Sequence, residues 1–198
     1  LSRVSEFDRF PVEMAVEALG SARIGGLLER LVAENAFVTR EDEDLYSFHP
    51  LFREVLAARR PHDDEQRSIL RRAGLWYLRR ADRRYPYTID LFERAGCRDD
   101  LLAELDKPRP IRFYHDDVSA VLRLARSLPE SIALRHPGAA LQFVFFLFLY
   151  GTPADAVLAR RLADRLERAV AAGRSPRRNR VLGEIKIIRA IVGQSSDV

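Results

Sequence analysis

One segment constrains the fold of this chain more than any other. Residues 45–56 read LYSFHPLFREVL, and they follow an amphipathic helical pattern, LLERLVAENAF, and an acidic turn, REDED. Tyr46 and Phe48 alternate with Ser47, which is the period of a strand that buries one face. The local order is therefore helix, strand, turn, strand, helix. It predicts a small winged helix in which residues 40–44 form the turn of the wing.

A histidine stands where the second strand gives way to a helix. Pro50 follows His49 directly, and proline is favoured at the first position of a helix, where its missing N–H has no intrahelical partner. Helix starts carry partial positive charge and unpaired N–H groups, so a polar side chain at this point suits an anion or a phosphate. The alternative is that His49 has a structural role, capping its helix or filling the base of the wing.

Helical spacing dominates the rest of the chain. Between the breaks at Pro129, Pro137, Gly151 and Pro176 the apolar residues recur every three or four positions, and no further segment alternates with period two. The sequence predicts a mostly α protein, with a winged helix and its short β-hairpin followed by an α-helical array. The predicted parts are the winged helix at 1–61, an arm of linker helices at 62–110 and the start of a helical repeat domain at 111–198.

Two features refine the prediction for the array. Gly151, Ala156 and Ala163 are spaced like the small residues of a tetratricopeptide helix pair, which predicts a tetratricopeptide-like solenoid. The apolar run at residues 138–151, GAALQFVFFLFLYG, is shorter than the roughly 20 residues that cross a bilayer. We therefore expect a buried core helix and no contact with a membrane.

The chemistry-bearing residues favour a protein that is not an enzyme. The four histidines are scattered, the single cysteine excludes an internal disulfide, and no lysine follows Gly25-Gly26 to make a phosphate-binding loop. No nucleophile elbow is visible. We expect no catalytic residue, no metal site and no cofactor in this chain. A lone cysteine fits a reducing compartment, so the cytoplasm is the expected location.

Two segments resemble a known family. LLERLVAENAFV and YSFHPLFREVLAARR, joined by a short acidic turn, resemble the winged-helix domain of MalT-type regulators. These are large ATP-binding transcriptional activators of the LuxR class, within the STAND group of signal-transducing NTPases. RRAGLWYLRRA and SLPESIALRHPGAALQFVFFLFLYG are similar to the helical arm and the sensor solenoid of the same family. The resemblance covers nearly the whole chain.

The resemblance implies a switch regulated by ATP or ADP, and it implies that this chain is a fragment. A nucleotide-binding domain would precede Leu1, and a DNA-binding helix-turn-helix would follow Val198. The solenoid would bind a small-molecule inducer or a regulatory protein. In related STAND proteins the histidine of a Met-His-Asp segment contacts the phosphates of ADP. His49 matches that histidine, whereas Phe48 and Pro50 replace its neighbours.

These observations leave three hypotheses. The first is a regulatory fragment in which the winged helix contacts its own NTPase domain, His49 contacts ADP, and DNA is bound only by a C-terminal domain outside this chain. The alternative is a helical-repeat scaffold for protein–protein interaction with no nucleotide role. The third is direct DNA binding by this winged helix, which the acidic wing opposes because it repels phosphate.

Overall fold

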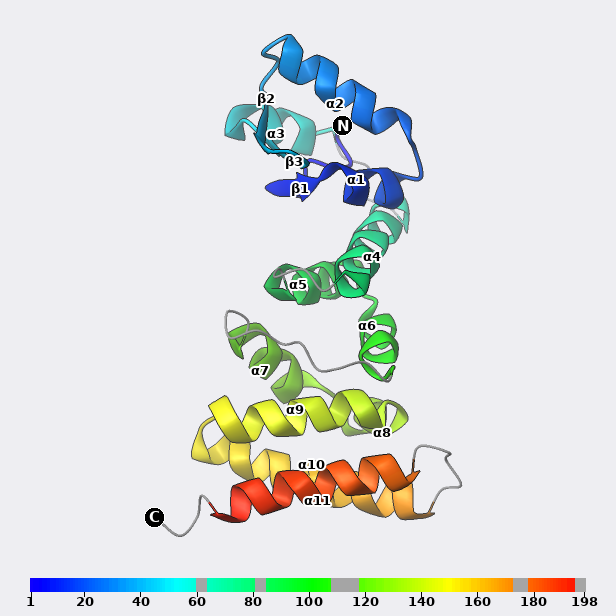
Figure 1. The fold of residues 1–198 in the computed structure, drawn as a ribbon, viewed down its shortest axis with the longest axis vertical. Helices are drawn as coiled ribbons and strands as arrows, with labels where there is room; N and C mark the ends of the chain where they lie inside the picture. The colour runs from blue at the N-terminus through cyan, green and yellow to red at the C-terminus, as the bar shows by residue number, and fades with distance from the viewer. Residues whose placement is uncertain (60–63, 81–84, 108–117, 173–177, 195–198) are drawn as a thin grey trace. The chain divides into compact units, whose positions relative to one another are not determined.

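The computed structural model describes residues 1–59, 64–80, 85–107, 118–172 and 178–194 (Figure 1). The chain separates into two compact units, Leu1–Cys97 and Arg98–Val198. The first unit contains a small antiparallel sheet with helices, and the described residues of the second unit form helices without a strand. The predicted mostly α class, with a winged helix followed by a helical array, is confirmed.

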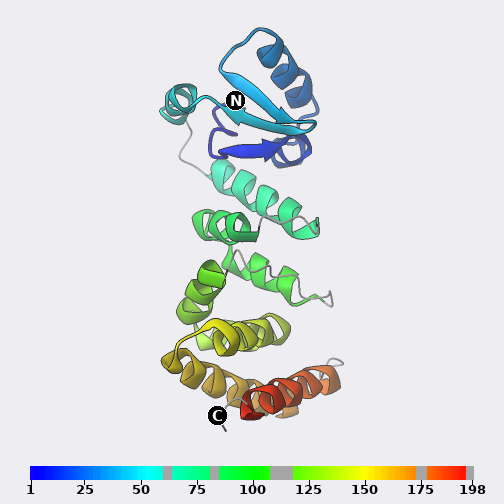
Figure 2. The same ribbon diagram turned by 60° about the vertical axis from the view of Figure 1, so that its left-hand side comes forward.

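The sheet has three strands, and the third in sequence lies in the middle (Figure 2). They are β1 (Arg9–Pro11), β2 (Val38–Asp42) and β3 (Leu45–Phe48), and both pairings are antiparallel. Phe10 of β1 lies opposite Tyr46, and Val38 of β2 lies opposite Phe48. Tyr46 and Phe48 are buried, as their alternation predicted. The hairpin was expected from the sequence, and β1 was not.

The turn of the wing is shorter than the sequence predicted. β2 continues through Asp42 and pairs with β3 across a bulge between Arg40 and Asp42. A bulge places an extra residue on one strand and increases the local twist. The acidic segment therefore belongs mostly to a strand, and only Glu43 and Asp44 make the turn.

Three short helices complete the winged helix. They are α1 (Val12–Leu19), α2 (Arg23–Ala33) and α3 (Pro50–Ala57). α1 ends at Gly20, whose φ of 65° is the left-handed conformation that glycine adopts readily at a helix end. α3 differs from the other two because none of its residues is buried. A single residue, His49, separates it from β3.

The next two helices share the core of the winged helix. α4 (Asp64–Arg79) and α5 (Tyr85–Ala95) follow the sheet in sequence. Ile69, Ala73 and Trp76 of α4 lie in one cluster of buried side chains with Met14 and Ala18 of α1. At the edge of this contact Arg79 pairs with Glu17 at 2.9 Å. The winged helix therefore buries apolar surface against α4 within one compact unit.

The predicted division into parts 1–61, 62–110 and 111–198 stays a prediction. Its first boundary falls among residues 60–63 and its second among residues 108–117, and both lie outside the described residues.

The second unit is built on a long apolar helix, α9. The helices are α6 (Arg98–Leu105), α7 (Val118–Ser127), α8 (Glu130–Arg135), α9 (Pro137–Tyr150), α10 (Pro153–Ala172) and α11 (Arg178–Gln194). Both α10 and α11 pack against α9 (Figure 1). α9 is the predicted core helix, with seven buried residues. The described helices include none long and apolar enough to span a membrane. The tetratricopeptide-like assignment stays a prediction.

A carboxylate from a distant helix end caps α9. Oδ1 of Asp106 accepts the N–H of Gly138 at 2.6 Å and that of Ala139 at 3.4 Å. These N–H groups belong to the first helical turn and have no intrahelical acceptor. Gln142 Nε2 adds a bond to the carbonyl of Leu105 at 2.9 Å. The end of α6 is thus attached to the start of α9, which links the unit over more than 30 residues of sequence.

Replacing Gly74 with Ala should destabilise the first unit. A Cβ at Gly74 would lie 2.6 Å from a ring carbon of Phe92, so α4 and α5 would have to separate. We expect a loss of about 1–3 kcal/mol, as for other overpacked cores. The readout is the fluorescence of Trp76, the only tryptophan, during urea unfolding.

The matched control is Gly26→Ala in α2, where a Cβ would meet no atom within 4 Å. Because glycine is a poor helix former, this change should stabilise the same unit by about 0.5–1 kcal/mol. Equal effects of the two substitutions would contradict the packing described for Gly74.

Candidate functional site

His49 stands at the junction that the sequence predicted. It is the N-cap residue of α3, Pro50 is the first helical residue, and the side chain is exposed. Its N–H donates to the carbonyl of Phe37 at 2.8 Å, and its own carbonyl accepts the N–H of Arg53 at 3.0 Å. The main chain of His49 therefore continues the β2–β3 pairing on one side and begins α3 on the other.

The imidazole of His49 does not cap its own helix. No side-chain cap hydrogen bond is present, and the ring lies edge-on to Phe37, with the two centroids 5.9 Å apart. No hydrogen bond therefore supports the hypothesis that the side chain of His49 only caps α3. What remains is an exposed imidazole beside the unpaired N–H groups of a helix start.

The surroundings of His49 suit a negatively charged ligand. The first turn of α3 carries no acidic residue, so no carboxylate of the helix itself occupies the positive end of its dipole. The nearest charged side chain on α3, Arg53, forms an ion pair with Asp8. The arrangement offers an imidazole and backbone N–H groups, which can hold a phosphate.

Apolar side chains are exposed around this junction. Phe37, Leu51 and Val55 have exposed fractions of 60%, 65% and 53%. The ring of Phe37 also stacks on Phe52, with the centroids 5.9 Å apart. The sequence patterns drew attention to His49 but not to Phe37, because the two residues are twelve positions apart and meet only through strand pairing.

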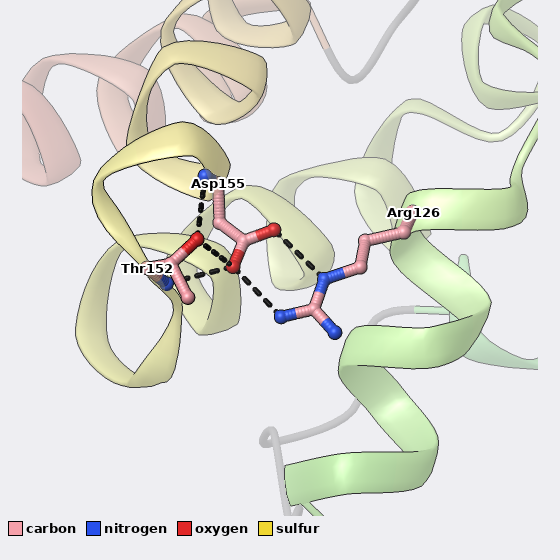
Figure 3. A network of polar contacts seen from close by, with 3 residues as sticks. All are labelled: Arg126, Thr152 and Asp155. Carbon is pink, nitrogen blue, oxygen red and sulfur yellow. Dashed lines mark hydrogen bonds and ion pairs between the residues drawn. The ribbon is translucent and has the colours of Figure 1, made fainter.

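A second polar cluster lies in the helical unit, where Arg126 of α7 meets the start of α10 (Figure 3). Nε and Nη2 of Arg126 donate to the two oxygens of Asp155 at 2.8 and 2.7 Å. Asp155 Oδ2 also accepts the N–H of Thr152 at 2.7 Å and its hydroxyl at 2.8 Å. Only the T-P-A-D spacing, a capping-box pattern, could have indicated part of this network from the sequence.

These contacts shift the ionisation of both partners. The hydrogen bonds from Arg126, followed by those from the N–H and hydroxyl of Thr152, hold the pKa of Asp155 far below its usual value. The bond to Asp155 in turn raises the pKa of Arg126. Gly151 keeps the turn tight, because a Cβ there would lie 2.3 Å from the carbonyl of Leu147. The cluster joins α7 to α10 and therefore has a structural role.

Other candidate chemistry is absent from the described residues. They contain no group of three or more histidine, cysteine or carboxylate side chains that could hold a metal ion. His136 precedes α9 as His49 precedes α3, whereas His62 and His115 lie outside the described residues. Cys97 is half-buried, and its thiol donates to the carbonyl of Ala95 at 3.4 Å.

The comparison with protein families bears on the winged helix. Residues 1–68 match the family model of the MalT winged helix domain. The match covers 68 of the 198 residues and ends within α4. No curated protein and no solved structure matched the chain. The segment similar to a MalT winged helix thus includes His49, Phe37 and the whole three-stranded sheet.

The MalT-like winged helix lacks the charge of a DNA-reading surface. The exposed residues of α2 include Arg23 and Arg30 but also Glu29, and the C-cap residue Glu34 is exposed as well, so these charges balance. The wing exposes Glu41, Asp42, Glu43 and Asp44. Phosphates dominate the affinity of proteins for DNA, and this surface does not attract them.

We therefore expect the chain to show no salt-sensitive binding to a DNA duplex. At roughly 50 mM salt the dissociation constant should exceed about 10⁻⁴ M, the weak end of non-specific binding. Fluorescence anisotropy with a labelled duplex measures it. The double variant Asp42→Lys/Glu43→Lys, which reverses the wing charge, is the control and should bind more tightly. Wild-type binding that weakens steeply with salt would restore the DNA hypothesis.

Replacing Asp155 with Asn should destabilise the helical unit at neutral pH. The folded-state pKa of Asp155 lies below its unfolded value, so the carboxylate contributes stability above an unfolded pKa of about 3.9 and loses it as the pH falls toward the folded pKa. The difference in thermal unfolding midpoint between Asp155→Asn and wild type should be largest near pH 7 and should decrease below about pH 4. Circular dichroism measures it.

Asp164→Asn removes one negative charge from the exposed face of the same helix and is the control. A gap between Asp155→Asn and wild type that stays constant from pH 7 to pH 2 would contradict the role of the ionised Asp155–Arg126 pair.

Proposed function

We propose that this chain is a regulatory part of an ATP-dependent transcriptional activator of the MalT type, in the LuxR class and the STAND group. Its winged helix would read the nucleotide state of an NTPase domain in the same polypeptide. Its helical array would bind an inducer or a regulatory protein. The observation that supports the proposal most directly is the exposed His49 at the start of α3, inside the segment that matches the MalT winged helix domain.

The proposed chemistry is recognition of a phosphate without catalysis. ADP bound to the NTPase domain would present its phosphates to the imidazole of His49 and to the first N–H groups of α3. Each of these groups donates to an anion, and the helix dipole favours negative charge at the same point. The described residues include no group of three or more histidine, cysteine or carboxylate side chains that could hold a metal ion. In this proposal ATP and ADP would be ligands of the parent protein.

The proposed mechanism is a shift between two populations. In the closed form the winged helix lies against the nucleotide-binding domain with ADP between them, and in the open form it is released. An inducer on the helical array would favour the open form if it binds that form more tightly. DNA binding would belong to another domain of the activator, consistent with the acidic wing, and the whole protein would act in the cytoplasm.

A second candidate function is a helical-repeat scaffold with no nucleotide role. It is supported by the apolar side chains exposed on the helical unit, such as Leu149 and Val157. The scaffold needs nothing from His49, so the two functions differ in what they require of this residue.

Replacing His49 with Ala in the full-length protein should release ADP faster and raise transcription without inducer. Loss of a hydrogen bond to a charged group corresponds to about a ten- to hundredfold change in the dissociation rate. Stopped-flow fluorescence with an ADP analogue and a reporter assay measure the two effects.

His136→Ala is the matched control, because His136 also precedes a proline at the start of a helix. It should leave ADP release unchanged. If His49→Ala also leaves both ADP release and basal transcription unchanged, the nucleotide role is wrong and the scaffold becomes the better hypothesis.

A further inference from the structure

Phe37 has a backbone conformation that its sequence does not favour. Its φ is 59°, in the left-handed region, where a bulky side chain is an outlier. Asn35 is also left-handed, with φ 51°, but its conformation is explained by its position at the end of α2. The N–H groups of Asn35 and Ala36 close α2 by donating to the carbonyls of Val32 and Leu31 at 3.1 and 2.8 Å. Phe37 takes no part in that cap.

Burial does not explain the conformation of Phe37 either. The side chain is 60% exposed, so the strained backbone does not serve to place a large ring in the core. Strained residues persist where the surrounding structure holds them, and they are concentrated at functional sites. The contacts of Phe37 therefore indicate what the strain achieves.

Those contacts converge on His49. Val38 lies opposite Phe48 in the sheet, so Phe37 and His49 form the next pair along the two chains. The carbonyl of Phe37 accepts the N–H of His49, and the two rings meet edge-on with their centroids 5.9 Å apart. The ring of Phe37 is also held by Phe52 of α3, on which it stacks at an interplanar angle of 27°.

Polar contacts within the described residues do not orient the imidazole. Within the described part of the chain, the side chain of His49 makes no hydrogen bond and no ion pair. An exposed histidine without a polar partner rotates among several side-chain conformations. An aromatic neighbour held on its far side by a second ring restricts that rotation.

We propose that Phe37 is a positioning residue for His49. Its left-handed backbone and its ring, which is supported by Phe52, hold the imidazole in one orientation at the start of α3. Under the proposed function, on which this inference rests, that orientation directs a ring nitrogen toward the phosphates of ADP. In this proposal Phe37 itself does not contact the phosphates of ADP.

The exposed ring of Phe37 also has an alternative explanation. Together with Leu51 and Val55 it forms part of an apolar surface that a partner could cover. The two explanations predict different outcomes on substitution. A docking surface needs an apolar side chain, which leucine provides, whereas positioning needs a flat ring, which tyrosine provides. Leucine, tyrosine and phenylalanine all carry a Cβ, so they share the steric cost of the left-handed backbone.

The first experiment observes the imidazole of His49 in the 198-residue chain. With isotope-labelled histidine the four imidazoles give separate signals, and His49→Ala assigns the one of interest. We expect nuclear Overhauser effects between the rings of Phe37 and His49 in the wild type. Phe37→Leu should shift the His49 signals and let the imidazole rotate more freely. Phe37→Tyr should leave the signals and the restricted rotation as in the wild type. Val55→Ala, an exposed apolar residue on α3, is the control and should change neither.

An absence of contacts between the two rings in the wild type would overturn the inference. That measurement needs no Phe37 variant, so it decides the question even if such a variant does not fold. The fluorescence of Trp76 reports whether each variant retains the fold of the first unit.

The second experiment measures ADP release from the full-length protein. If the orientation of His49 matters, Phe37→Leu should speed release by a factor approaching that of His49→Ala, roughly tenfold or more. The double variant should release ADP no faster than His49→Ala alone, and Phe37→Tyr should resemble the wild type. Val55→Ala should also resemble the wild type.

The outcomes separate this inference from the proposed function. Fast release in His49→Ala with wild-type release in Phe37→Leu overturns the positioning role and leaves the nucleotide role intact. Wild-type release in His49→Ala overturns the nucleotide role, and the ring contacts seen by nuclear magnetic resonance then decide the positioning alone. Wild-type release in Phe37→Leu together with fast release in Phe37→Tyr assigns Phe37 to a docking surface instead.

Discussion

The central position of β3 is the constraint on which the winged helix depends. β1 pairs with one edge of β3 and β2 with the other, so the strand has both rows of backbone groups satisfied. Its alternate side chains, Tyr46 and Phe48, point into the core. A one-residue shift in register would expose both of them. Because β3 is held from both sides, the residue that follows it, His49, has a defined place even though its own side chain is exposed.

The core shows why a winged helix of this size needs the helices that follow it. Small domains bury only a modest fraction of their surface, and here α3 contributes no buried residue. α4 supplies the missing apolar face, with Ile69, Ala73 and Trp76 packed among the residues of α1. The exposed Arg79–Glu17 ion pair between α4 and α1 adds little, since it is screened by water. The apolar contact is therefore what joins α4 to the winged helix.

Local patterns could be predicted from the sequence, and contacts between distant residues could not. Pro50 marks the start of α3 because the proline ring fixes its own backbone, so the place of His49 followed from two neighbouring residues. β1 was missed because three residues show no periodicity, and only pairing with β3 makes them a strand. The conformation of Phe37 was missed for a related reason. Nothing in its neighbours requires a left-handed phenylalanine, and its contacts with His49 and Phe52 exist only after folding.

The number of hydrogen bonds at each polar cluster decides which one is open to a ligand. A carboxylate accepts about four hydrogen bonds. Asp155 receives four, two from Arg126 and two from Thr152, and it is buried, so its hydrogen bonds are made within the fold. Arg126 already makes a bidentate contact with Asp155. The imidazole of His49 is the opposite case, since it is exposed, has no hydrogen-bond partner among the described residues and lies at a helix start, where N–H groups lack intrahelical acceptors. A saturated network stabilises the fold, whereas an oriented and unsaturated one retains the capacity to bind.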